Sequence, residues 1–244
     1  MDLGIDLHAT VAEALLHRKR NHRVDHLNQI EMVIEGVRQK GLLQAADKVL
    51  WKGNGDRYKQ TFHSKETWEC IRFQGQRRTW YKGIWFSQAT PKYSFIVWLA
   101  TLNRLTTGDR MQQWSTSVDT SCPLCSAPLE TRNHLFFTCP YSAEIWTNLA
   151  SKLLTTKFTT VWETILALLT DSSLEKSTLF LLRYTFQASV HSLWKERNSR
   201  RHGEPHVSPA LFIKRTDRLI RNRLLSIHAN EHYAQCLSLW LATR

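Results

Sequence analysis

The chain has 244 residues, and 42% of them are hydrophobic. This length allows one large domain or two small ones, and the hydrophobic fraction is enough for a core. Nine Gly and six Pro are too few for a fibrous or disordered chain. Lys and Arg outnumber Asp and Glu by 33 to 21, and the net charge of +12 favours a polyanionic partner, usually nucleic acid, over a basic but inert surface. Five cysteines, an odd number, indicate a reducing compartment instead of a disulfide scaffold. We find no signal peptide and no apolar run of about 18–20 residues, which predicts a soluble intracellular protein, nuclear or cytoplasmic, without membrane contact.

The N-terminal part, residues 1–46, is predicted to be a helical arm. Apolar residues recur at helical spacing over residues 8–40, and Gly41 is placed to end the helix. The run HRKRNHR at residues 17–23 interrupts this pattern and forms a cationic face if the helix is continuous. A solvated helix face is favoured for this run over a binding site, and both interpretations stay open.

The next part, residues 47–115, is predicted to contain a hairpin followed by aromatic-rich helices. Aromatic and β-branched residues flank Gly53, Asn54 and Gly55 within residues 48–63, which is typical of a β-hairpin with glycines at the turn. Thr90 followed by Pro91 predicts a helix start. The helix that follows is apolar nearly all round over residues 92–102, which favours core packing over base stacking as the role of its aromatics.

Residues 116–150 are predicted to be a zinc-binding module. The sequence reads Cys-Pro-Leu-Cys from Cys122 to Cys125, then eight residues to His134 and four more to Cys139. Three thiols and one imidazole at this spacing form a Cys3His ligand set, which predicts one structural zinc ion with all four positions filled by protein. If residues 134–139 are helical, we expect His134 and Cys139 to lie on roughly one face. The alternative is a loop with scattered buried cysteines.

The last part, residues 151–244, is predicted to form basic C-terminal helices. Residues 183–223 hold ten Lys or Arg against three acids. Two helices with basic outer faces are able to bind phosphate groups without reading sequence, although charge that serves solubility explains the same pattern. The predicted nucleic-acid contacts are Lys195, Arg197, Arg200, Arg201, Lys214, Arg215, Arg218 and Arg221.

The segments CPLCSAPLETRNHLFFTC and SVHSLWKERNSRRHG resemble the zinc-binding domain found downstream of the polymerase in plant non-LTR (LINE-like) retrotransposons. The resemblance runs from about Asp47 to the C-terminus and is strongest over residues 79–150. The family's four ligands, of CCHC type, correspond to the four residues above, and Glu130 and the cluster of Trp194, Arg197 and Asn198 match its pattern too. The resemblance implies a structural zinc site and a role with RNA or DNA.

The sequence departs from the parent elements where polymerase chemistry would be expected. That chemistry requires paired aspartates that hold two divalent metals, and no adjacent Asp-Asp pair occurs here. The acidic residues do not cluster as in a ribonuclease H site either. We therefore expect a detached fragment of the polyprotein without reverse transcriptase or other enzyme activity.

Together these patterns predict a mainly α fold: a helical bundle with one short β-hairpin and an embedded Cys3His zinc module. The expected function is that of a retrotransposon-derived structural zinc-binding protein that binds RNA or DNA non-specifically. The alternatives are a helical protein-interaction scaffold and an inactive retroelement remnant. A protein partner is compatible with either role, and no small-molecule substrate is expected.

Overall fold

The computed structural model describes residues 3–41, 48–53, 55, 57–73, 75–76, 78–115 and 117–244. The chain divides into two compact units, Met1–Gly75 and Gln76–Arg244. The domain boundaries predicted after residues 46 and 115 adjoin residues outside the described part. The boundary predicted after residue 150 falls within one continuous helix, α7, Pro140–Leu154.

The first unit begins with two helices that contact each other, α1, Val11–Leu16, and α2, Asp25–Lys40. A capping box between Thr10 and Glu13 starts α1, and Gly41, with φ of 73°, ends α2 as predicted. The prediction of helix over residues 8–40 is wrong at residues 17–24. These residues form a loop, because the side chains of His17 and His22 turn toward the buried carboxylate of Glu31 on α2.

The predicted hairpin is present in the same unit. Strands β1, Trp51–Lys52, and β2, Tyr58–Lys59, pair antiparallel, with Trp51 opposite Lys59. Of the predicted turn residues, Asn54 lies outside the described residues. Helix α3, Ser64–Ile71, follows.

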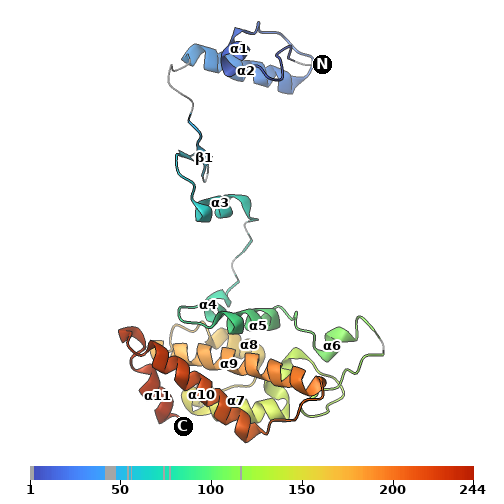
Figure 1. Ribbon diagram of the computed structural model, residues 1–244, viewed down its shortest axis with the longest axis vertical. Helices are drawn as coiled ribbons and strands as arrows, with labels where there is room; N and C mark the ends of the chain where they lie inside the picture. Colours follow the sequence, from blue (N-terminus) through green and yellow to red (C-terminus); the bar gives the residue numbers. More distant parts are fainter. Residues whose placement is uncertain are drawn as a thin grey trace. The chain divides into compact units, whose positions relative to one another are not determined.

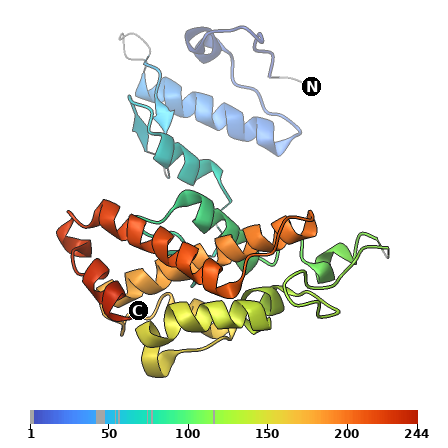
Figure 2. The same cartoon turned by 60° about the horizontal axis from the view of Figure 1, so that its bottom comes forward.

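The second unit is helical and is organised around α9, Lys176–Arg201. Helices α5 and α10 lie on opposite sides of α9 in Figures 1 and 2, and α7 and α11 also pack on it. The remaining bounds are α4, Tyr81–Ile84; α5, Pro91–Thr101; α6, Gly108–Met111; η1, His134–Thr138; η2, Thr155–Lys157; α8, Trp162–Leu168; α10, Pro209–Ile227; η3, Glu231–Tyr233; and α11, Cys236–Ala242.

The core of this unit is a cluster of aromatic rings. Phe137 lies 5.1 Å from Trp146, 5.6 Å from Trp162 and 5.7 Å from Phe186, measured between ring centroids. Each of these side chains is at most 1% exposed. Such pairs contribute about 0.5–1.5 kcal/mol each beyond their buried area. Phe137 belongs to the segment between His134 and Cys139, so the predicted metal module is built into the core.

The predicted fold class is confirmed: the chain is mainly helical, with a two-stranded hairpin and the four Cys and His residues of the motif close together. Among the described residues, no helix has the length and apolar character needed to cross a membrane.

Candidate metal centre

The first two candidate ligands lie on a tight loop. The amide of Cys122 donates to the carbonyl of Ala127 over 2.8 Å, and the amide of Ser126 donates to the carbonyl of Cys122 over 2.8 Å. These two hydrogen bonds close the loop around Pro123 and Leu124. Ser126 takes a φ of 62°, a left-handed conformation that reverses the chain direction directly after Cys125. The loop therefore turns both sulfur atoms toward one side.

The other two candidate ligands bracket a π-helix, η1. In an α-helix, residues five apart would be separated by about 140° around the axis. Here the amide of Cys139 donates to the carbonyl of His134 over 2.7 Å, the i to i+5 bond of a π-turn. The wider turn brings His134 and Cys139 to the same side, so the expected common face is present, through a different helix type. Pro140 then begins α7.

The structure brings all four predicted residues together. The ligand atoms of Cys122, Cys125, His134 and Cys139 lie within 4.8 Å of one another, and the Cys125 Sγ is 3.2 Å from the His134 Nε2. Zn–S bonds of about 2.3 Å in a tetrahedron place two sulfurs about 3.8 Å apart. The arrangement thus fits one tetrahedral ion after small side-chain shifts. Cys122 and Cys139 are fully buried, and Cys125 and His134 are partly exposed.

The protonation of these groups suits a cation-binding site. Burial lowers the pKa of His134, which favours the neutral imidazole that a metal requires. A hydrogen bond from the Cys122 thiol to the Cys139 sulfur lowers the pKa of Cys139, and the same bond, together with burial, raises the pKa of Cys122. A bound zinc ion would supply the positive charge that keeps all three thiols ionised.

A buried ion pair ties this module to the central helix. The carboxylate of Glu130, fully buried, accepts from the Arg197 Nη2 over 2.6 Å and from the Arg197 Nε over 3.0 Å. It also accepts from the amide of Gly108 over 3.1 Å, where a side chain would collide with the carbonyl of Thr120. The Arg197 guanidinium lies 4.9 Å from the centroid of the Trp194 ring. The residues that the sequence resemblance singled out, Glu130, Trp194 and Arg197, therefore form one structural contact.

Two further arginines of α9 bind the loop that carries the first ligands. Arg200 donates to the carbonyl of Leu124 over 3.2 Å and to the Glu196 carboxylate over 2.8 Å. Arg201 donates to the carbonyl of Asp119. The three arginine side chains thus hold the metal module against α9, and we call them the α9 clamp: Arg197, Arg200 and Arg201.

The clamp corrects part of the predicted nucleic-acid surface. The side chain of Arg197 is 3% exposed and that of Arg200 is 6% exposed, so both are paired inside the protein and face no phosphate. Arg201 is half-buried and bonded to the backbone. The prediction from charge missed this role, because the spacing of basic residues along a helix does not show which of its faces packs against the rest of the protein. The signal available was Glu130, whose buried charge requires a cation.

The other five predicted cations are exposed. Four of them lie on α10, and the fifth lies on α9. Arg221 pairs with Asp217 over 2.7 Å and remains 44% exposed. They are Lys195, Lys214, Arg215, Arg218 and Arg221.

Comparison with known proteins identifies the stretch around the cluster. Residues 62–146 match the family model described as zinc-binding in reverse transcriptase. The match includes all four candidate ligands and Glu130, and over these residues it confirms the resemblance inferred from the motifs. Arg197, Arg200 and Arg201 lie outside the matched residues. No curated protein and no solved structure matches the chain.

Proposed function

We propose that this chain is a retrotransposon-derived protein in which one structural zinc ion organises a helical domain. On this proposal the basic surface of that domain binds RNA or DNA without sequence preference, and the chain has no reverse transcriptase activity of its own. The observation that carries the proposal is the convergence of Cys122, Cys125, His134 and Cys139 within a matched zinc-binding domain.

The ligand set supports a structural zinc ion over a catalytic one. Three thiolates and one imidazole satisfy zinc without a water molecule, whereas catalytic sites keep an open position for one. The residues around the cluster hold its geometry: Thr131 accepts from the amide of His134 through its hydroxyl over 3.2 Å, and the clamp fixes the Cys122 loop. We therefore propose no hydrolytic or polymerase role for this centre.

The exposed cations support the nucleic-acid part of the proposal. Lys214 and Arg218 are four residues apart on α10, and Arg221 follows at three, so these side chains form a stripe along the helix. Lys195, Lys214, Arg215 and Arg218 have no hydrogen-bond or ion-pair partner within the described part of the chain. Their charges are therefore available to phosphate groups, which bind in a salt-dependent and sequence-independent way.

Salt dependence tests this part directly. If all five exposed cations contact a single strand, the logarithm of the binding constant should fall against the logarithm of salt concentration with a slope of about −3.5. We expect the triple substitution Arg215→Gln, Arg218→Gln and Arg221→Gln to weaken binding to every sequence alike and to flatten this slope. Fluorescence anisotropy with labelled RNA and DNA measures both quantities.

A matched control removes the same charge elsewhere in the second unit. Lys82, Lys92 and Arg104 are exposed on or beside α4 and α5, and their joint change to Gln should leave the slope nearly unchanged. Wild-type affinity in the α10 variant, or binding that does not depend on salt, would remove α10 from the proposal.

A protein-interaction role is the second candidate, and one observation favours it. The first unit exposes large apolar side chains near and on α3, with Phe73 at 93%, Ile71 at 72% and Trp68 at 60%. Such a patch is typical of a protein contact. Salt-independent binding in the titrations above would make this candidate the better one.

A further inference from the structure

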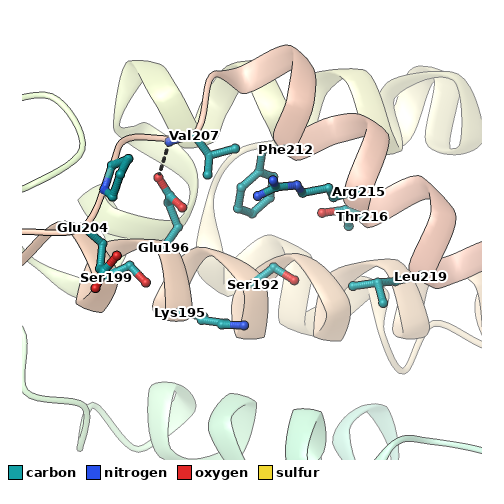
Figure 3. A pocket seen from close by; sticks show the side chains of 11 residues that line it. Ser192, Lys195, Glu196, Ser199, Glu204, Val207, Phe212, Arg215, Thr216 and Leu219 are labelled. Carbon is teal, nitrogen blue, oxygen red and sulfur yellow. Dashed lines mark hydrogen bonds between the residues drawn. The ribbon is translucent and has the colours of Figure 1, made fainter.

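A pocket lies between α9 and α10, beside the exposed cations (Figure 3). Its volume is about 340 Å³, within the range of small-ligand sites. The loop between the two helices closes one end, where the Glu196 carboxylate accepts from the amide of Val207 over 3.0 Å. The same carboxylate accepts from Arg200 of the clamp. The pocket is therefore preformed and is held open by the residues that fix the metal module.

The lining combines apolar side chains with small polar groups. Val207, Phe212 and Leu219 supply the apolar part, and the hydroxyl groups of Ser192 and Thr216 lie among them (Figure 3). A nucleobase needs this combination, because its faces are apolar and its edge carries hydrogen-bond donors and acceptors. A pocket for a purely aliphatic ligand would not need the hydroxyl groups.

The charges at the pocket favour an anion. Lys195 lines it from α9 and Arg215 from α10, and neither side chain has a hydrogen-bond or ion-pair partner among the residues the structure describes. Two acids also line the pocket, Glu196 and Glu204. The charge of Glu196 is compensated by Arg200 at 2.8 Å, so the two free cations face Glu204 alone.

We infer that this pocket receives an unpaired base of single-stranded RNA or DNA, while Lys195 and Arg215 bind the phosphates on either side of that base. This inference rests on the proposed nucleic-acid binding and adds strand preference to it. In a duplex the bases are paired and stacked, so they do not enter such a pocket without an unstacking cost. The protein should therefore prefer single strands to duplexes while remaining tolerant of sequence.

The test compares a labelled oligothymidylate with an abasic oligonucleotide of the same length, using the zinc-loaded full chain. Both ligands carry the same phosphates, and only the first has bases. Stacking of one base is expected to make the oligothymidylate bind roughly 5- to 150-fold more tightly. Filling the pocket with Ser192→Phe should abolish this difference and keep both the affinity for the abasic strand and its salt slope.

Two further variants keep the result interpretable. Ser226→Phe adds the same ring to an exposed position of α10 outside the pocket and should keep the full preference. Leu219→Ala trims the pocket wall without adding bulk, and it should reduce the preference even if Ser192→Phe fails to fold.

Equal affinity of the wild-type chain for the two strands overturns the inference, while salt-dependent binding of both leaves the proposed function standing. Binding to neither strand overturns both. A polyglutamate peptide that binds the wild-type chain but not Ser192→Phe, together with equal affinity for the two strands, would assign the pocket to an acidic protein segment and also overturn the inference.

Discussion

At the scale of single residues, Arg197 joins the metal module to the helical core. It is 3% exposed, its Nε and Nη2 both donate to the buried Glu130 carboxylate, and its Nη2 also donates to the carbonyl of Thr106 over 3.0 Å. A buried charge that loses its partner is costly, because no water replaces the missing contact. The stability of the second unit should therefore depend on this side chain far more than on the exposed cations.

Replacing Arg197 with Ala should lower the free energy of unfolding by about 3–5 kcal/mol, since it leaves Glu130 buried and unpaired. Urea denaturation followed by tryptophan fluorescence measures the loss. Lys195 is two residues away on the same helix and is exposed, so Lys195→Ala should change stability by less than about 0.5 kcal/mol. Equal effects of the two changes would show that the ion pair does not stabilise the unit.

The metal ligands were predictable from sequence, whereas the clamp was not. Cys122, Cys125, His134 and Cys139 lie within one short stretch whose spacing is specific for zinc. Glu130 and Arg197 are 67 positions apart, and their pairing depends on how α9 packs against the module. No local pattern encodes that contact, so the arginines of α9 were assigned to the surface with the truly exposed cations of α10.

At the scale of elements, a buried carboxylate of α2 binds two histidines of the loop between α1 and α2. Glu31 is 2% exposed, and its Oε1 lies 3.0 Å from the Nε2 of both His17 and His22. The hydrogen bond with His22, followed by that with His17, lowers the pKa of Glu31 to about 2. The apolar residues on either side of this loop have helical spacing, which indicated helix throughout. That spacing carries no information on the contact of two histidines with a carboxylate, so the loop was not predicted.

This carboxylate makes the pairing of α1 and α2 sensitive to acid. The pKa of Glu31 is lowered from its ordinary value of 4.5 to about 2. Its contribution to the stability of the α1–α2 pair is therefore fully present above pH 4.5 and is lost as the pH falls toward 2. Glu31→Gln should produce the same loss at neutral pH, seen as faster amide hydrogen exchange in residues 25–40.

Glu35→Gln is the matched control for this change. Glu35 lies one turn further along α2, is 31% exposed and pairs with Arg38. A partly exposed pair at i,i+3 contributes little. The bonds from Arg38 to the carbonyls of Leu15 and His17 do not involve Glu35, so exchange in this variant should stay close to wild type. Identical exchange in the Glu31 and Glu35 variants would contradict the role given to Glu31.

Other elements followed from local signals. Thr90 and Pro91 mark the start of α5, and Ser208 caps α10, where its side chain accepts from the amide of Leu211. The stripe of cations on α10 was predicted correctly as exposed because the opposite face is strongly apolar, with Phe212, Ile220 and Leu224 buried. Helix α9 gave no such signal, since it is buried on several sides and polar residues line much of its covered surface.

At the scale of the whole molecule, the metal module and the core of the second unit form one structure. Phe136 and Phe137 lie between the third and fourth ligands and are fully buried in the aromatic cluster. The clamp adds contacts from α9 to Glu130 and to the backbone near the first two ligands. The π-helix is thus held at both ends by candidate ligands, His134 and Cys139, and along its length by the core.

Removing the metal should therefore loosen the module together with the part of the core that packs on it. Hydrogen exchange after chelation is expected to rise in residues 116–154 and in α9, and to stay unchanged in residues 3–41, which form contacts within their own unit. Zinc in small zinc-finger peptides contributes roughly 10–16 kcal/mol of apparent binding free energy, and part of that would be lost here. Increased exchange confined to residues 116–142 would show that the module is separable from the core.

The central claim is that the four residues form a closed zinc site, and X-ray absorption at the zinc edge tests it most directly. The purified chain should hold one zinc ion, with three sulfur neighbours at about 2.3 Å and one nitrogen at about 2.0 Å. The double substitution Cys122→Ser and Cys125→Ser should remove the ion. A chain without zinc, or a spectrum with an oxygen neighbour in place of a sulfur, would contradict the closed structural site.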